Sequence, residues 1–139
     1  MNRTEIVLAV VQCGAQICLA RRSRAVATGQ GLWSVVTGFV ETDTDPVTQA
    51  WTEVDEELGL RSPDVRLARR LEPVNLTNPA SGKEFLVYPF LFECNATQAL
   101  VLNWEHDDVQ WAEPSRLESA DCVGWQFPLV RALLEPESR

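Results

Sequence analysis

Three glutamates lie close together near the middle of the chain, at Glu53, Glu56 and Glu57. On a helix their spacing of i, i+3 and i+4 places them on one face, where like charges repel. A divalent cation would relieve this repulsion. Carboxylate oxygens with no His or Cys next to them in sequence suit Mg²⁺ or Mn²⁺ better than Zn²⁺. The cluster therefore predicts a metal-ion site, and a solvated acidic helix face is the alternative.

The elements around the cluster are those that would hold it in place. Asp45 as N-cap, Pro46 as the first helical residue and Gly59 after the last turn predict a helix over Pro46–Leu58. Apolar residues repeat at helical spacing on a neighbouring arc, at Val47, Trp51, Val54 and Leu58. This arc would fix the helix to a core and hold the carboxylates at a constant angle.

The stretch from Gly38 to Leu60 resembles the Nudix box, a glycine, glutamate and arginine motif that ends in a pair of glutamates and a glycine. The matching positions are Gly38, Glu53, Val54, Glu56, Glu57, Gly59 and Leu60. Two positions differ, because Thr44 replaces the first glutamate and Thr52 replaces the arginine. In the family that arginine helps to orient the glutamate that follows it.

The resemblance implies an α/β fold, a Nudix-like α/β/α sandwich with a mixed β-sheet, in one domain over residues 1–139. It implies that Glu53, Glu56 and Glu57 bind Mg²⁺ or Mn²⁺ together with a backbone carbonyl of the Gly38 turn, at Thr37 or Gly38. The same three glutamates would be catalytic. A weaker, positional resemblance adds Glu105 as a further ligand or base, with Asp107 as second choice.

Other segments supply the sheet. Apolar runs and turn residues predict a hairpin of Ile6–Val11 and Gln16–Ala20, with the first strand central in a covered sheet. Further strands are predicted over Leu32–Val36, Val65–Val74, Glu84–Cys94 and Val109–Ala112, a helical turn over Ser115–Ala120, and a closing helix over Gly124–Leu134. Pro89 inside the segment Glu84–Cys94 predicts an edge strand or a bulge there.

Arginines and aromatic residues are the candidates for substrate binding. Arg21 and Arg22 could contact phosphates, because a guanidinium matches phosphate oxygens, and a solvated strand end is the alternative. Trp104 is the most plausible aromatic binding residue because it adjoins a charged loop. His106, the one histidine of the sequence, could act as a base, but a lone histidine in a polar loop is expected to be solvated.

Composition limits the partners. A net charge of −8 over 139 residues argues against a nucleic-acid polymer or an anionic membrane as a partner. The apolar run near the N-terminus is too short for a membrane helix or a secretion signal, which predicts a cytoplasmic protein. Families resembling this one often form dimers, so a homodimer is an open alternative.

The function implied by the resemblance is a metal-dependent hydrolase that cleaves a pyrophosphate bond in a nucleoside diphosphate derivative. The second hypothesis is a catalytically weak or inactive Nudix-like domain that binds a nucleotide or a protein partner, and it is motivated by Thr44 and Thr52. A structural domain without metal is the third.

Overall fold

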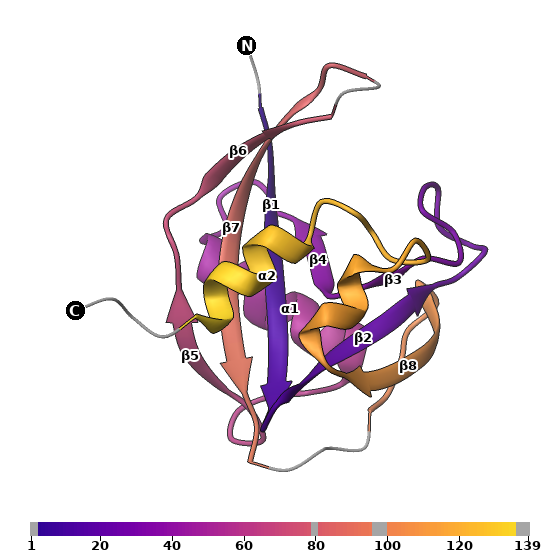
Figure 1. The fold of residues 1–139 in the computed structure, drawn as a ribbon. Helices are drawn as coiled ribbons and strands as arrows, with labels where there is room; N and C mark the ends of the chain where they lie inside the picture. The colour runs from indigo at the N-terminus through magenta and orange to yellow at the C-terminus, as the bar shows by residue number, and fades with distance from the viewer. Residues whose placement is uncertain (1–2, 79–80, 96–99, 136–139) are drawn as a thin grey trace.

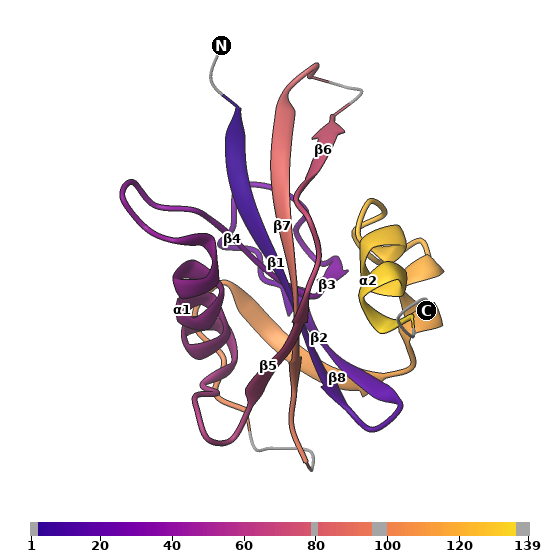
Figure 2. The same cartoon turned by 90° about the vertical axis from the view of Figure 1, so that its left-hand side faces the viewer.

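The protein forms one mixed β-sheet with a helix packed on each face, as the two views in Figures 1 and 2 show. This architecture comes from a computed structural model that describes residues 3–78, 81–95 and 100–135. It confirms the predicted sandwich. The elements in chain order are β1 (Thr4–Cys13), β2 (Gln16–Arg22), β3 (Trp33–Ser34), β4 (Val36–Phe39), α1 (Pro46–Leu58), β5 (Arg66–Arg70), β6 (Val74–Thr77), β7 (Glu84–Glu93), β8 (His106–Ala112), the 3₁₀ helix η1 (Pro114–Glu118) and α2 (Phe127–Leu134).

Strand β1 lies at the centre of the sheet. It runs parallel to β7 on one side and antiparallel to β4 and β2 on the other. Successive side chains of a strand point to opposite faces, and here the two sets enter two different cores. Ile6, Leu8 and Val10 pack on the α2 side, and Val7, Ala9 and Val11 on the α1 side. The run is therefore apolar without alternation, as predicted for a strand covered on both faces.

The predicted strand Leu32–Val36 is divided in the structure. Trp33 pairs with Arg21 of β2, whereas Val36 pairs with Ala9 of β1. Between them the Val35 N–H donates to the Gln126 side chain at 3.0 Å instead of to a strand. The chain changes its partner strand at Val35, and the second piece continues through Gly38. Gly38 thus lies inside β4, and the turn predicted at this glycine comes later.

The predicted strand Val65–Val74 is also divided, into β5 and β6, which pair with different halves of β7. Pro73 immediately precedes β6 and has no N–H to donate. The prediction of an edge or a bulge at Pro89 was wrong, because β7 is an interior strand whose pairing with β1 continues through Pro89. Pro89 lies where its other neighbour changes from β6 to β5, and its carbonyl accepts a hydrogen bond from Leu71 N–H at 3.2 Å.

Helix α1 has the predicted bounds. Gly59 follows its last turn in the left-handed conformation, at φ 72°, and donates its N–H to the Asp55 carbonyl. Asp45 occupies the N-cap position, but its side chain makes no capping hydrogen bond. The apolar arc of α1 lies on the sheet, with Val54 and Leu58 buried in the core on that face.

The C-terminal elements cover the opposite face. Strand β8 begins at His106, earlier than predicted, because its pairing with β2 extends to Arg22. The predicted turn at 115–120 is η1, and α2 begins at Phe127, a few residues after the predicted start.

Within the described ranges, no helix is long and apolar enough to cross a membrane.

Candidate active site

Two of the three predicted glutamates are buried side by side. Glu53 and Glu57 are 9% and 2% exposed, and they lie one turn apart on α1. Glu56 is exposed, although its negative charge still acts on Glu53 and raises the pKa of that carboxyl. The predicted acidic face is therefore divided into a buried pair and a third carboxylate on the solvent side.

Strand β4 contacts Glu53 directly. A Cβ atom placed on Gly38 would lie 2.2 Å from Cδ and 2.3 Å from Oε1 of Glu53, much closer than atoms can approach. Only glycine leaves room for the carboxylate here. The Nudix-box glycine of this chain thus serves a close approach between strand and helix.

The ladder between β1 and β4 shows which carbonyls are free. Val40 N–H donates to the Glu5 carbonyl at 2.9 Å, so these two residues form a hydrogen-bonded pair. Such pairs alternate along an antiparallel ladder, and the next one joins Val7 and Gly38. The Gly38 carbonyl is therefore engaged with β1, whereas the Thr37 carbonyl points away from β1. Of the two predicted carbonyl ligands, Thr37 is the one that the sheet leaves free.

Gln49 holds the Glu53 carboxylate from within the helix. Its Nε2 donates to Glu53 Oε2 at 2.8 Å, and its Oε1 accepts from the Glu41 backbone N–H at 3.1 Å. Gln49 is 2% exposed. The sequence analysis missed this residue, although it precedes Glu53 by four positions, a spacing that brings side chains together on a helix.

His106 faces Glu57 in the interior. Nε2 of His106 and Oε1 of Glu57 are 3.6 Å apart, too far for a normal hydrogen bond, and both side chains are 2% exposed. The expectation of a solvated histidine was wrong, because pairing of β8 with β2 places His106 opposite Arg22, and its buried side chain faces Glu57. Within the described part of the chain, the buried side-chain atoms without a partner are Glu57 Oε2 and His106 Nδ1.

Burial changes the protonation chemistry of this group. It raises the pKa of Glu57 well above that of an ordinary carboxyl, and the charge of Glu53 raises it further. Burial also raises the pKa of Glu53, while the hydrogen bond from Gln49 acts in the opposite direction. The pKa of His106 is lowered by burial, so its ring is neutral at neutral pH. All three groups thus lie where uncompensated charge is unfavourable.

Glu105 lies near the buried pair, since its negative charge raises the pKa of both Glu53 and Glu57. It is half-buried, and Asn103 holds the loop by accepting from the Glu105 N–H at 3.1 Å. The structure therefore brings this predicted residue to the α1 acids from a distant part of the chain.

The two predicted arginines differ in their surroundings. Arg21 forms an ion pair with Asp107 at 2.7 Å and lies over the Trp33 ring. Arg22 donates from Nε to the Thr28 carbonyl at 2.9 Å, and its positive charge lowers the pKa of Glu57. Of the two arginines, Arg22 is the one whose charge acts on the buried acids.

Trp104 is 66% exposed, next in sequence to Glu105. Its backbone carbonyl accepts a hydrogen bond from the Ser23 hydroxyl at 2.7 Å, so the loop is fixed while the ring faces solvent. An exposed indole beside half-buried Glu105 is available for stacking.

The residues of this site fit a divalent cation in their chemistry. Two adjoining carboxylates offer hard oxygen ligands, and Glu57 Oε2 has no partner among the residues that the structure describes. Across the described ranges, however, no three His, Cys, Asp or Glu side chains are grouped so that they could hold a metal ion. Of the three predicted glutamates, Glu53 and Glu57 form the buried pair, and Glu56 is exposed.

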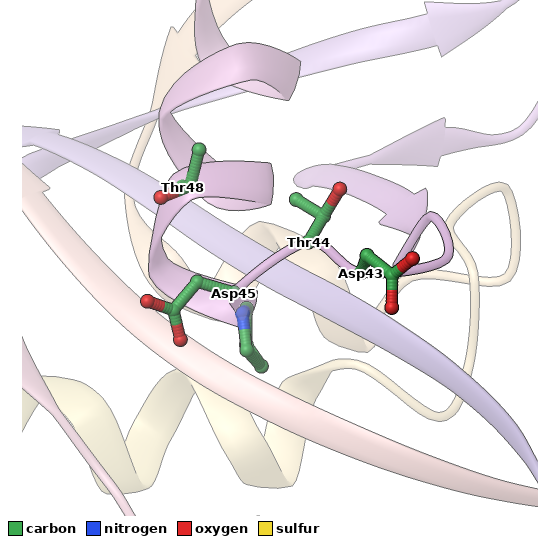
Figure 3. A pocket seen from close by; sticks show the side chains of 5 residues that line it. Asp43, Thr44, Asp45 and Thr48 are labelled. Carbon is green, nitrogen blue, oxygen red and sulfur yellow. The ribbon is translucent and has the colours of Figure 1, made fainter.

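The clearest hollows of the surface lie elsewhere. One of about 560 Å³ lies at the start of α1, lined by Asp43, Thr44, Asp45, Pro46 and Thr48 (Figure 3). A second of about 420 Å³ adjoins it and includes Arg70, Tyr88 and Phe90. Neither is lined by the glutamates. On a helix Asp45 and Glu53 are separated by roughly 12 Å. The buried carboxylates thus lie apart from both hollows.

Comparison with known proteins decides the family. The family profile described as "NUDIX domain" matches residues 1–133. The chain belongs to the Nudix family. Its departures from the Nudix box are at Thr52, which is exposed, and at Thr44, which lines the first hollow. Membership of this family supports the predicted class of activity, a Nudix-type hydrolase.

Solved structures show the same fold for this Nudix chain. The MutT protein from Methanosarcina mazei Go1 has a TM-score of 0.74 and 20% identity, over 96% of this chain and 95% of that one. A C. elegans Ap4A hydrolase binary complex has a TM-score of 0.71 and 18% identity, over 92% and 93%. The M. smegmatis Nudix hydrolase RenU has a TM-score of 0.73 and 12% identity, over 99% and 90%. No curated protein sequence matches this Nudix chain.

Proposed function

We propose that this protein is a divalent-metal-dependent Nudix hydrolase that cleaves a pyrophosphate bond in a nucleoside diphosphate derivative or a related small pyrophosphate. The observation that carries the proposal is the pair of adjoining buried carboxylates, Glu53 and Glu57, of which Glu57 Oε2 has no partner. Uncompensated buried carboxylates destabilise a fold and accumulate at functional sites. One of the similar structures is an Ap4A hydrolase by its description, and a substrate of that kind belongs to the class proposed here.

In this proposal Glu53 and Glu57 would hold Mg²⁺ or Mn²⁺, with Glu56 from the solvent side and the backbone carbonyl of Thr37, because the Gly38 carbonyl is engaged with β1. When bound, the ion offsets phosphate charge and lowers the pKa of an attacking water. Glu105 or Glu53 would serve as the base for that water. The charge of Arg22 acts toward the same place, where a guanidinium can hold phosphate oxygens, with Arg21 beside it. Trp104 offers its exposed ring to a base.

The test is hydrolysis of a panel of nucleoside diphosphate derivatives and dinucleoside polyphosphates with Mg²⁺ or Mn²⁺, for wild type and Glu57→Gln. We expect the wild type to cleave at least one compound, and the variant to lose most of this activity because it lacks a carboxylate ligand. Equal rates for the two proteins would refute the proposal.

The second candidate is a Nudix-like domain that binds a nucleotide or a protein partner without turnover. It is favoured by Thr52, which is exposed in the position where the family has its arginine. Tight nucleotide binding without hydrolysis, together with activity gained by the double change Thr44→Glu and Thr52→Arg, would select this candidate.

A further inference from the structure

We infer that Gln49 is the residue that positions Glu53, so that this protein orients its first acidic ligand through an amide inside α1. The inference deepens the proposed function and rests on it for the role of Glu53 as a metal ligand. Gln49 is not one of the positions that match the Nudix box, so the motif alone does not suggest this positioning role.

The Glu53 carboxylate is held on two sides. Gln49 Nε2 donates to Oε2 at 2.8 Å, and Gly38 lies against Oε1 and Cδ so closely that a Cβ atom would overlap them. Gln49 is 2% exposed, so water does not compete for this hydrogen bond. With one oxygen bound by the amide and the other against the strand, the carboxylate has one favourable orientation.

The amide itself is also fixed. Its Oε1 accepts the Glu41 backbone N–H at 3.1 Å, in the loop between β4 and α1. A backbone N–H can only donate and an ionised carboxylate can only accept, so the amide can satisfy both in one of its two orientations alone. Gln49 therefore links Glu53 to the loop that follows Gly38 and sets the distance between helix and strand at this point.

The two altered box positions do not provide this support. Thr52 precedes Glu53 by one position, so it points in a different direction, and it is exposed. Thr44 lines the hollow at the start of α1, where its hydroxyl lies 3.5 Å from the Thr42 carbonyl. Gln49 is one turn before Glu53 on the same face, where a long polar side chain reaches the carboxylate.

The test compares Gln49→Met with a matched variant, Gln126→Met. Gln126 is 1% exposed, accepts from Val35 N–H at 3.0 Å and donates to the Ser34 hydroxyl at 2.8 Å, on the other side of the sheet. Both changes keep the side-chain length and remove a buried amide with two hydrogen bonds. We measure the Mn²⁺ dissociation constant by electron paramagnetic resonance, and the free energy of unfolding in EDTA.

We expect Gln49→Met to weaken Mn²⁺ binding about ten- to a hundredfold, the usual effect of removing a group that orients a metal ligand. Gln126→Met should lose similar stability and keep its Mn²⁺ affinity within about twofold of wild type, because it has no link to Glu53. Should Gln49→Met not fold, Gln49→Ala, which leaves room for water at both former partners, takes its place.

Unchanged Mn²⁺ affinity in Gln49→Met, with weakened binding in Glu53→Gln, would overturn the inference and leave the proposed function intact. If the wild type binds no Mn²⁺, the proposed function fails, and a crystal structure of metal-free Gln49→Met decides the inference. A Glu53 carboxylate that has moved away from Gly38 supports it. A carboxylate in its original place overturns it.

Discussion

Gln49 and Gln126 are buried on opposite faces of the sheet, and their amides have the same pattern of contacts. Gln126, on the α2 side, joins a backbone N–H to the Ser34 hydroxyl, which is neutral. Gln49, on the α1 side, joins a backbone N–H to the carboxylate of Glu53. One amide closes a gap between strands and a helix, whereas the other orients an ionisable group.

The surroundings of these amides differ in the same way. The α2 side is an apolar core built from residues such as Leu129, Val130 and Leu133. The α1 side contains Glu57, and the unpartnered buried atoms of the described residues, on Glu57 and His106, lie together there. Buried polar atoms normally have hydrogen-bond partners. The exceptions among the described residues lie together here, which is typical of a ligand-binding site.

Substitution of two glycines, Gly38 and Gly124, tests the difference between the two faces, and we expect the largest effect on hydrolysis here. Gly38→Ala would place a methyl group 2.2 Å from Cδ of Glu53, so the carboxylate or the strand must move. We expect hydrolysis to fall at least about a hundredfold, since small displacements of catalytic groups have effects of this size. Gly124→Ala, where no atom lies within 4 Å of the new methyl, should keep full activity. Steady-state kinetics of both variants measure the difference.

Similar rates for Gly38→Ala and the wild type would show that the close approach of strand and helix does not matter for catalysis. A crystal structure of this variant would then show how Glu53 accommodates the methyl group.

Glu57→Gln tests the cost of the buried charge in the absence of metal. Replacing this carboxyl should raise the free energy of unfolding in EDTA at pH 7.5 by about 1–3 kcal/mol, because a buried acid with a raised pKa opposes folding above the ordinary carboxyl pKa. Glu56→Gln, at an exposed position, should change it by less than about 0.5 kcal/mol. Urea unfolding measures both values. A Glu57→Gln variant less stable than wild type in EDTA would contradict the assignment of Glu57 as an unfavourably buried carboxylate.

The pH dependence of the metal-free protein follows from the same carboxyl. Its pKa is raised in the folded state, so between the ordinary carboxyl pKa and the raised one the folded protein binds more protons than the unfolded one. The free energy of unfolding should therefore fall as pH rises through this window. In Glu57→Gln the decrease should be smaller, and equal slopes for the two proteins would show that Glu57 does not cause it.

The arginines offer the smallest effect. Arg22→Met should raise KM for the substrate about three- to tenfold. The charge of Arg22 acts on the buried acids, and we propose that its guanidinium holds phosphate oxygens beside them. Arg21→Met removes an exposed ion pair with Asp107, which solvent screens, and should raise KM less than Arg22→Met does. The ratio of the two KM values is the measurement. A larger effect at Arg21 would place the phosphate site nearer to β8 than we propose.

Much of the fold follows from local patterns. The bounds of α1, the first hairpin and the central place of β1 were predicted from caps, turn residues and an unbroken apolar run. The predictions failed where a strand changes its partner, at Val35, at Pro73 and at Pro89. Such changes depend on which strand lies alongside, and no local pattern records this.

Only part of the candidate site was predicted, again because local patterns do not record which distant segments lie alongside. The spacing of the three glutamates indicated a shared helical face, and the structure buries two of them and exposes Glu56. Gln49 could have been found from its distance of four positions to Glu53. The burial of His106 could not, because it depends on the pairing of β8 with β2.

By itself the sequence determined helix α1 and the acidic residues along it, since caps and helical periodicity act between neighbours in the chain. Only the tertiary structure decided that Glu53 lies between Gly38 and Gln49, and that Glu57 meets His106. Burial is set by segments that are distant in sequence, and burial converts a row of ordinary carboxylates into a pair with raised pKa values.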